Sequence, residues 1–139
     1  MTESTIYSMK QACKKTNLTY DTLKFYCNEG LVPNVKRDKN NYRIFDDRDI
    51  AWINGLNCLK NCGMGIAEMK YYMNLCLQGE STIPERKKIL DLKLAQLHNK
   101  IDEINESINY INNKQQYYDD VLSGKIIYTS NLISTKESN

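Results

Sequence analysis

The N-terminal third of the chain carries a concentration of basic side chains. Residues 8–45 contain eight lysines and arginines against three acidic residues, a local net charge of +5, whereas the complete sequence of 139 residues has a net charge of +2. Lysines and arginines that neutralise phosphates release counterions condensed on a nucleic acid. The region therefore predicts a surface for a polyanion such as DNA, and a solvated basic face is the alternative that charge alone leaves open.

Five cysteines are the second group of residues that could do chemistry. Their odd number and uneven spacing do not suggest a disulfide framework, so we expect reduced thiols. A thiolate is the reactive form toward aldehydes, quinones and oxidants. Cys62 follows Cys58 by four residues on the same face of a helix, where it could be a resolving thiol or half of a metal site. The same spacing would arise if both cysteines were simply small side chains buried in the core.

The sequence offers no constellation for catalysis. It contains one histidine, His98, no glycine-rich phosphate loop and no recognisable pair of carboxylates, so we expect neither an enzyme nor a cofactor. With 41% apolar and 26% charged residues, the composition is that of a soluble globular protein too short to be a large two-domain enzyme. No apolar run reaches the roughly 18–20 residues of a membrane span and the start lacks a signal-peptide pattern, so we expect a cytoplasmic protein without membrane contact.

Local patterns predict a helix-turn-helix near the N-terminus. Residues 8–16 place apolar side chains on one helical face, and a second helix begins after Thr19, whose hydroxyl is a good N-cap, and ends before Gly30. In a helix-turn-helix the second helix, here Tyr20–Asn28, is the one offered to a major groove. Residues 32–45 have β-prone ends around a polar turn and predict a β-hairpin wing. The side chains expected on the core side are Leu18, Leu23 and Tyr26.

Three more helices are predicted beyond the wing. Asp46 or Asp47 caps a helix that ends at Gly63, and a fourth helix spans Gly65 to Leu77. After a polar break, Pro84 suits the first turn of a long helix. The chain is therefore expected to be mainly α-helical, with a winged helix-turn-helix domain at 1–78, a linker at 79–83, a dimerisation helix at 84–122 and a tail at 123–139.

The long helix carries an apolar seam that alternates steps of four and three residues, as coiled coils do. The seam consists of Leu90, Leu94, Leu97, Ile101, Ile104, Ile108, Ile111, Gln115, Tyr118 and Leu122. Its length of about 50 Å is too great for the head to cover, so we expect a homodimer joined by a long coiled coil. We expect the two helices of this coiled coil to be antiparallel. Folding of the helix back on its own chain is less favoured, because the residues after Gly124 show no helical stripe.

These segments, in their order and spacing, resemble the MerR family of transcriptional regulators. The matching segments are Tyr7-Ser8-Met9-Lys10-Gln11-Ala12, Thr22-Leu23-Lys24-Phe25-Tyr26, Glu29-Gly30-Leu31-Val32-Pro33, Arg37-Asp38 and Asn41-Tyr42-Arg43-Ile44-Phe45-Asp46. The resemblance covers about residues 6–122. The family prefers other residues, namely arginine, tyrosine, glutamate and glycine, at Lys24, Phe25, Cys27 and Asn41. Lys24 keeps the positive charge but lacks the bidentate fork of arginine, and Asn41 still tolerates a positive φ.

The resemblance implies a double-stranded promoter DNA partner and a set of DNA-contacting residues. This set comprises Lys15, Tyr20, Thr22, Lys24, Phe25 and Tyr26 in the helix-turn-helix and Arg37, Tyr42 and Arg43 in the wing. Their types suit phosphate contacts, and the start of the recognition helix suits base readout. The spacing of Phe25 and Tyr26 fits a protein core equally well. The resemblance also implies a palindromic operator that the dimer twists and bends, which realigns promoter elements for RNA polymerase.

Cysteine placement bears on the stimulus. Residues 79–139 contain no cysteine, so a metal site there would lack thiolate ligands. The segment Asn57-Cys58-Leu59-Lys60-Asn61-Cys62-Gly63-Met64 resembles the AdhR/NmlR-like subgroup, which responds to aldehyde and thiol stress, and the resemblance implies that Cys58 is the sensor. Lys60 lies on a different side of the helix, so a cation that lowers the thiol pKa would have to come from elsewhere.

Two alternatives stay open at this point. One is a metal-responsive regulator that uses Cys58 and Cys62 across the dimer. The other is a coiled-coil adaptor whose basic head contacts a protein or another polyanion and has no DNA sequence preference. In the tail, we expect the apolar segments Ile126-Ile127-Tyr128 and Leu132-Ile133 to pack against the dimer helices.

Overall fold

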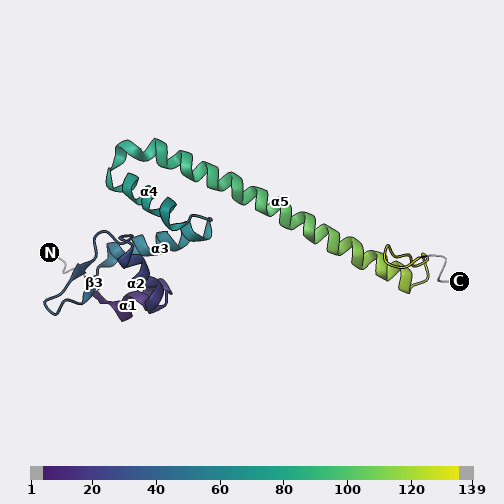
Figure 1. Ribbon diagram of the computed structural model, residues 1–139, viewed down its shortest axis with the longest axis horizontal. Helices are drawn as coiled ribbons and strands as arrows, with labels where there is room; N and C mark the ends of the chain where they lie inside the picture. Colours follow the sequence, from purple (N-terminus) through teal and green to yellow (C-terminus); the bar gives the residue numbers. More distant parts are fainter. Residues whose placement is uncertain (1–4, 135–139) are drawn as a thin grey trace. The chain divides into compact units, whose positions relative to one another are not determined.

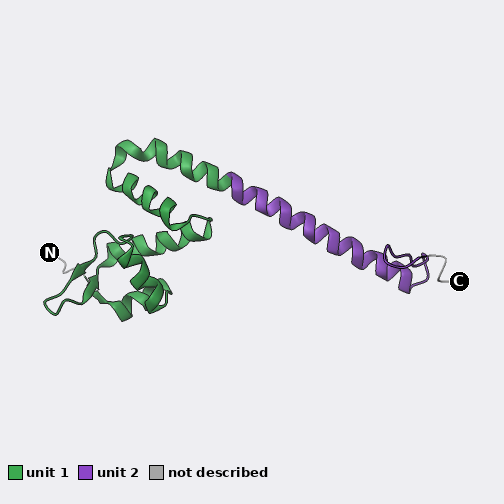
Figure 2. Ribbon diagram, in the orientation of Figure 1, with its two compact units in different colours: residues 1–94 green, residues 95–139 purple. Residues whose placement is uncertain are grey.

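The structure is a computed structural model that describes residues 5–134 (Figure 1). The ends of the predicted head and tail, residues 1–4 and 135–139, lie outside the described residues. The elements in chain order are β1 (Tyr7–Ser8), α1 (Met9–Thr16), α2 (Tyr20–Asn28), β2 (Lys36–Arg37), β3 (Arg43–Phe45), α3 (Asp47–Asn61), α4 (Ile66–Leu77), the 3-10 turn η1 (Glu80–Thr82) and α5 (Ile83–Leu122). The chain divides into two compact units, residues 1–94 and 95–139 (Figure 2).

Helices α1 and α2 form the predicted helix-turn-helix, and their ends follow from their caps. The Ser8 hydroxyl accepts from the backbone N–H of Gln11, whose side chain accepts in return from the Ser8 N–H, a capping box that starts α1 at Met9. Asn17 ends this helix in the left-handed region at φ +55°. Thr19 then caps α2 through its hydroxyl, 3.2 Å from the N–H of Thr22. The predicted bounds of the recognition helix are confirmed.

The predicted wing is present, and it belongs to a three-stranded antiparallel sheet with the order β1-β3-β2. The Asp38 carboxylate accepts from the backbone N–H groups of Asn40 and Tyr42, and Asn41 adopts φ +67°, which closes the turn between β2 and β3. The edge strand β1 was not predicted. It pairs Tyr7 with Phe45, so the segment before α1 is fixed to the wing.

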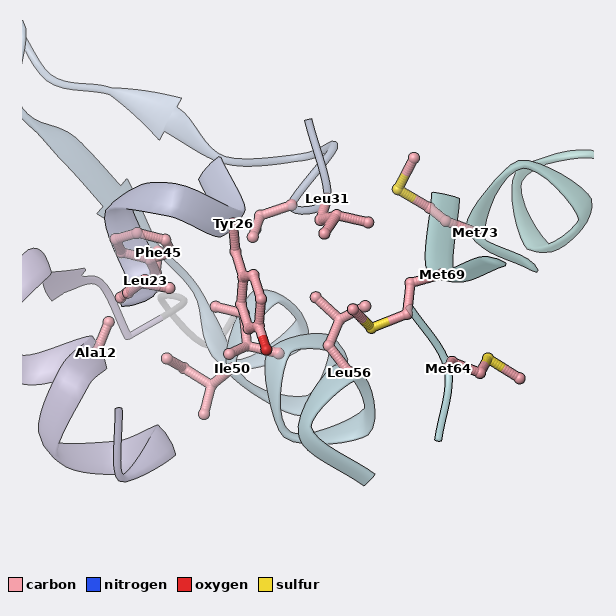
Figure 3. Close-up of a cluster of buried hydrophobic side chains, with 12 residues drawn as sticks. Ala12, Leu23, Tyr26, Leu31, Phe45, Ile50, Leu56, Met64, Met69 and Met73 are labelled. Atoms are coloured by element: carbon pink, nitrogen blue, oxygen red, sulfur yellow. The ribbon is translucent and has the colours of Figure 1, made fainter. Parts of the chain in front are cut away.

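A single core holds the helix-turn-helix, the wing and the next two helices together (Figure 3). Leu23 from α2, Phe45 from β3 and Ile53 from α3 are among its fully buried side chains. The other buried members are Ala12, Tyr26, Leu31, Val32, Ile50, Leu56, Met64, Met69 and Met73, while Leu18 packs against them partly exposed. Burial of an aromatic or aliphatic side chain contributes about 1.5–3 kcal/mol, so this core sets the position of α2 relative to the wing.

Helix α3 begins at the predicted Asp46 cap, which forms a second capping box with Asp49. The predicted linker 79–83 contains η1, and α5 starts at Ile83, one residue before Pro84. Arg86 in the first turn of α5 donates to the carbonyl of Gly79 at 2.6 Å and to the Thr82 hydroxyl at 3.0 Å. These bonds fix the joint between α4 and α5, which we call the Arg86 clamp.

The opening turns of α5 pack with the head. Lys93 is buried and forms an ion pair with Glu68 of α4, with 2.7 Å between Nζ and the carboxylate oxygen, and Ile89 packs against the core. The first compact unit accordingly extends to Leu94. No helix among the described residues is long and apolar enough to cross a membrane.

Helix α5 has 40 residues, a length of about 60 Å. The predicted seam lies open along it in the single chain. Leu97 is half-buried, whereas the side chains of Leu90, Leu94, Ile101, Ile104, Ile108, Ile111 and Tyr118 are between 39% and 58% exposed. Hydrophobic side chains at this spacing, uncovered over so many turns, are typical of a helix that pairs with another chain.

Candidate nucleic-acid interface

The surface of α2 away from the core carries most of the predicted DNA-contacting residues. Tyr20 is 57% exposed, Lys24 and Phe25 are also exposed, and Thr22 is half-buried. Leu23 and Tyr26 point the other way, into the core, because residues three apart share a helix face. The exposed surface of α2 therefore combines a cation with rings and hydroxyl groups, which suit contacts with a phosphate backbone and base edges.

Tyr26 corrects the predicted set. Its side chain is 2% exposed and lies among Leu23, Ile50 and Leu56 in the core, so its ring cannot reach a nucleic acid from this position (Figure 3). The buried phenol oxygen has no hydrogen-bond partner among the described residues. Burial raises the pKa of Tyr26 above its ordinary value, because the core disfavours the phenolate. Of the two interpretations that the sequence allowed, the core position is the one observed.

The wing places its basic residues beside α2. The Arg37 guanidinium donates to the carbonyl of Asn41 at 2.8 Å, which holds this exposed side chain over the turn. Tyr42 at the turn is 70% exposed. Arg43 is half-buried and donates to the side-chain oxygen of Asn28 at 2.8 Å, so it ties the wing to the last residue of α2. Arg43 thus orients the wing as well as adding charge.

Two hollows flank the recognition helix. One, of about 340 Å³, lies between α1, α2 and the wing and brings together four predicted residues and Lys10, which was not in the predicted set. Those four are Tyr20, Arg37, Tyr42 and Arg43. The other, of about 410 Å³, borders Thr22 and Phe25 and is completed by Lys60 and by Gly65 at the start of α4. Lys60 was not among the predicted DNA-contacting residues, because nothing local in the sequence shows that the end of α3 packs near α2.

Lys15 lies apart from these hollows. It is exposed near the end of α1, and its ammonium group lies 5.1 Å from the ring centroid of Tyr7. The Tyr7 phenol in turn donates to the Asp47 carboxylate at 2.6 Å. This bond raises the pKa of Tyr7, because a deprotonated phenol would lose the donor and repel the carboxylate. Lys15 is therefore held over the junction of β1 and α3.

The cysteines differ in exposure. Cys58 on α3 is exposed, whereas Cys13, Cys27, Cys62 and Cys76 are half-buried. Burial raises the pKa of the Cys13 and Cys27 thiols, which disfavours their reactive thiolate forms. Within residues 5–134 no three histidine, cysteine, aspartate or glutamate side chains gather as a metal site.

Comparisons with known proteins agree with this geometry. The family description "MerR HTH family regulatory protein" matches residues 7–76. An HTH-type transcriptional regulator of Haemophilus influenzae is 33% identical over 112 residues, 81% of this chain and 83% of that protein. The HTH-type transcriptional regulator AdhR of Bacillus subtilis is 37% identical over 83 residues, 60% of this chain and 59% of AdhR.

Among solved structures, the chain is similar to HiNmlR, described as a MerR family regulator lacking the sensor domain and bound to promoter DNA. The two share 30% sequence identity and superpose with a TM-score of 0.75, over 88% of this chain and 93% of HiNmlR. A MerR family regulator from Listeria monocytogenes superposes with a TM-score of 0.76 at 28% identity, over 86% of this chain and 90% of that one. The similarity thus extends beyond the helix-turn-helix into α5.

Proposed function

This chain belongs to the MerR family of helix-turn-helix regulatory proteins, and we propose that two copies of it bind a palindromic operator in promoter DNA and distort it. It is a DNA-binding transcriptional regulator and not an enzyme. The observation that carries the proposal is the hollow between α2 and the wing, where Tyr20, Arg37 and Tyr42 converge with Lys10. The binding of HiNmlR to promoter DNA supports the same use of this surface.

The phosphate contacts of this proposal come from both sides of α2. Arg37 and Tyr42 would contact the backbone on the wing side, and Lys60 with the start of α4 would contact it on the other side. Lys24 and Tyr20 would then lie toward the major groove. Lys15 and Arg43 would add charge to the same interface, and Arg43 would keep the wing at a fixed place relative to α2.

Dimerisation through α5 is the second part of the proposal. The exposed seam supplies the apolar face that one copy cannot cover. Charge favours an antiparallel arrangement, because residues 83–100 contain five basic and two acidic side chains, a net charge of +3, whereas residues 101–122 contain one basic and five acidic side chains, a net charge of −4. An antiparallel pair places unlike halves beside each other, while a parallel pair would place like charges together.

Distortion of the operator follows from binding by two heads at once. In an antiparallel pair the two α5 helices begin at opposite ends of the coiled coil, and each beginning is fixed to its head by the Arg86 clamp. A site whose two halves do not match this spacing must bend or twist to engage both heads. Smooth bending of a 20–30 base-pair site costs about 1–6 kcal/mol, which the contacts of both heads would offset. RNA polymerase would meet the altered promoter geometry without touching this chain.

Cys58 is our candidate for the sensor of an electrophile such as an aldehyde. Its exposure on α3 leaves the thiol accessible. The thiol proton passes to solvent, the thiolate sulfur bonds to the carbonyl carbon, and the π electrons of the carbonyl move to its oxygen, which takes a proton from water to give a hemithioacetal. The metal-responsive alternative would need ligands from a second chain, because Cys58 and Cys62 have no third ligand gathered beside them in the described part of the chain.

The test of DNA binding uses fluorescence anisotropy with a duplex from the promoter of the gene that encodes the protein and a scrambled duplex as competitor. We expect saturable binding to the promoter duplex that survives the competitor. Arg37→Gln should weaken binding and reduce the slope of log K against log salt by about one, whereas Lys100→Gln on α5 should change neither. Equal affinity for the scrambled duplex would instead support the coiled-coil adaptor.

The test of the stimulus uses promoter transcription by wild type, Cys58→Ala and the neighbouring control Cys62→Ala, under reducing, metal-chelated conditions with a low dose of aldehyde. We expect wild type and Cys62→Ala to respond and Cys58→Ala to bind DNA without responding. If Cys58→Ala responds like wild type, the thiol hypothesis is wrong even when DNA binding holds. A response that appears only when zinc or copper is restored would favour the metal-responsive alternative.

A further inference from the structure

Residues 125–133 return beside the last turns of α5, and we call this segment the hook (Figure 1). Tyr117 fixes it, because its phenol donates to the carbonyl of Thr129 at 2.8 Å and accepts from the Thr129 N–H at 2.7 Å. The turn is closed by a bridge between Ser130 and Ile133. One side chain of α5 thus satisfies both backbone groups of a residue in the hook, which gives the short segment a defined conformation.

The hook and α5 border an open hollow of about 610 Å³, a volume in the range of small-molecule sites. Four tyrosine rings line it, from Tyr110, Tyr117 and Tyr118 on the helix and Tyr128 on the hook. Lys114 lies among them, with its ammonium group 5.9 Å from the ring centroid of Tyr117 and 6.0 Å from that of Tyr118. The hollow therefore offers flat apolar surfaces and one cation.

The hollow lies to the side of the dimerisation seam. Tyr110, Lys114 and Tyr117 are each one residue before the seam positions Ile111, Gln115 and Tyr118, which corresponds to a rotation of about 100° around the helix. Only Tyr118 among the helix residues of the hollow belongs to the seam. A second copy on the seam would contact Tyr118 and lie beside Lys114, which flanks the seam, and would leave Tyr110, Asn113 and Tyr117 uncovered.

The electrostatics of the hollow favour a negative group. Lys114 is the single basic residue between Ile101 and Leu122, and no carboxylate within residues 5–134 lies at ion-pair distance from it. The pKa of Tyr117 lies below its ordinary value, first because the Thr129 side chain and backbone hydrogen-bond to the phenol oxygen and further because Lys114 is near, although burial opposes both. The same surroundings that stabilise a phenolate would stabilise a bound anion.

We propose that the hook hollow binds a small planar aromatic carboxylate. Its ring would stack against the tyrosines, where an offset or edge-to-face pair contributes about 0.5–1.5 kcal/mol beyond area burial. Its carboxylate would pair with Lys114, which lines the hollow. The amides of Asn113 and Asn131, which also line the hollow, would supply hydrogen bonds to the carboxylate oxygens. This site is separate from the DNA interface and from Cys58, and its existence does not depend on either.

Isothermal titration calorimetry of the full chain, without DNA, tests the proposal with 2-naphthoate as probe and neutral 2-naphthamide as its matched control. We expect saturable binding of 2-naphthoate and weaker binding of the amide. Lys114→Gln should lower the affinity for 2-naphthoate about fivefold. Lys100→Gln is the matched control, because Lys100 lies two heptads earlier at the equivalent coiled-coil position, and it should leave the affinity unchanged.

A second variant tests the hook itself. Tyr117→Phe keeps the ring but removes the hydrogen bonds of its hydroxyl to the backbone and side chain of Thr129, so it should weaken 2-naphthoate binding by between about twofold and tenfold. Circular dichroism should show the helix content of wild type in both variants. The absence of saturable binding, equal affinities for the acid and the amide, or an equal loss in Lys114→Gln and Lys100→Gln would each overturn the proposal, whatever the outcome of the DNA tests.

Discussion

Helices α2 and α5 are both amphipathic, but only α2 has its apolar face covered by its own chain. The short helix α2 buries Leu23 and Tyr26 in the core of its own chain and exposes its polar and aromatic side. The long helix α5 exposes its apolar seam and buries Lys93 in its early turns. The head therefore contains the interactions that stabilise it, whereas in the proposed dimer α5 beyond Leu94 would depend on a second chain. Stability of the coiled coil should depend on protein concentration, while that of the head should not.

The largest effect is expected in the seam. Ile104→Lys places two charges in the coiled coil of each dimer and removes two apolar side chains, so we expect the dimer dissociation constant to rise by about a thousandfold or more. Asn109→Lys adds the same charge on the outer side of α5 and is the control. Sedimentation equilibrium checks both variants. An unchanged dissociation constant for Ile104→Lys would remove the contrast between α2 and α5.

A smaller loss is expected from the buried side of α2. Leu23→Ala should lower the free energy of unfolding of the head by about 2–5 kcal/mol, because a fully buried leucine leaves a cavity. Lys24→Ala, the exposed neighbour, should change it by less than about 0.5 kcal/mol. Urea denaturation at two protein concentrations measures the change. A strong dependence of the Leu23→Ala effect on concentration would show that the head is not self-sufficient.

Tyr26→Phe keeps the buried ring of Tyr26 and removes its buried hydroxyl, so it separates their contributions to stability. Because the buried hydroxyl has no hydrogen-bond partner within residues 5–134, its removal should leave stability unchanged or raise it by up to about 1 kcal/mol. The raised pKa of Tyr26 also makes the folded state of wild type lose stability as pH rises from the ordinary tyrosine value, near 10, through the folded pKa. The variant should lack that loss in alkaline thermal melts. A destabilised variant would indicate a hydrogen-bond partner for the hydroxyl.

The smallest effect concerns the ion pair between Lys93 and Glu68. The hydrogen bond from Lys93, followed by its charge, lowers the pKa of Glu68, so the contribution of this pair is present above the unfolded pKa of the carboxyl and is lost as pH falls through the folded one. Glu68→Gln should slightly reduce the fall in melting temperature that wild type shows as the pH becomes acidic. Glu103→Gln, on the exposed middle of α5, is the control and should leave the acid dependence of the melting temperature as in wild type.

Local signals in the sequence were sufficient for the elements that carry their own caps or periodicity. Thr19 and Gly30 delimit α2, and the four-three alternation identifies α5, because these features act within a few residues. The strand β1 has no such signal, since a two-residue strand exists only through its pairing with β3. Packing of the apolar tail segments against the helices of a dimer remains a prediction. The conformation of the hook depends on a contact between Tyr117 and Thr129 that no pattern in the sequence indicates.

The candidate interface was predictable in residue type more than in position. The basic and aromatic residues of α2 and the wing were identified, but the choice between core and surface for Phe25 and Tyr26 depends on where α3 and α4 pack. Helical spacing places both near the boundary of the apolar stripe. The role of Lys60 beside α2 and the bond between Arg43 and Asn28 likewise depend on tertiary contacts.

The Arg86 clamp has a consequence for how such a chain can change. Within the described part of the chain, the hydrogen-bond partners of Arg86 lie in the preceding ten residues, namely the carbonyl of Gly79, the hydroxyl of Thr82 and, at 3.8 Å, the sulfur of Cys76. Recombination of genes after Leu94 would therefore carry the complete joint along with the head. A regulator could acquire a coiled coil of different length or pairing preference in one exchange, and so change its operator spacing, while the head continues to read the same half-site.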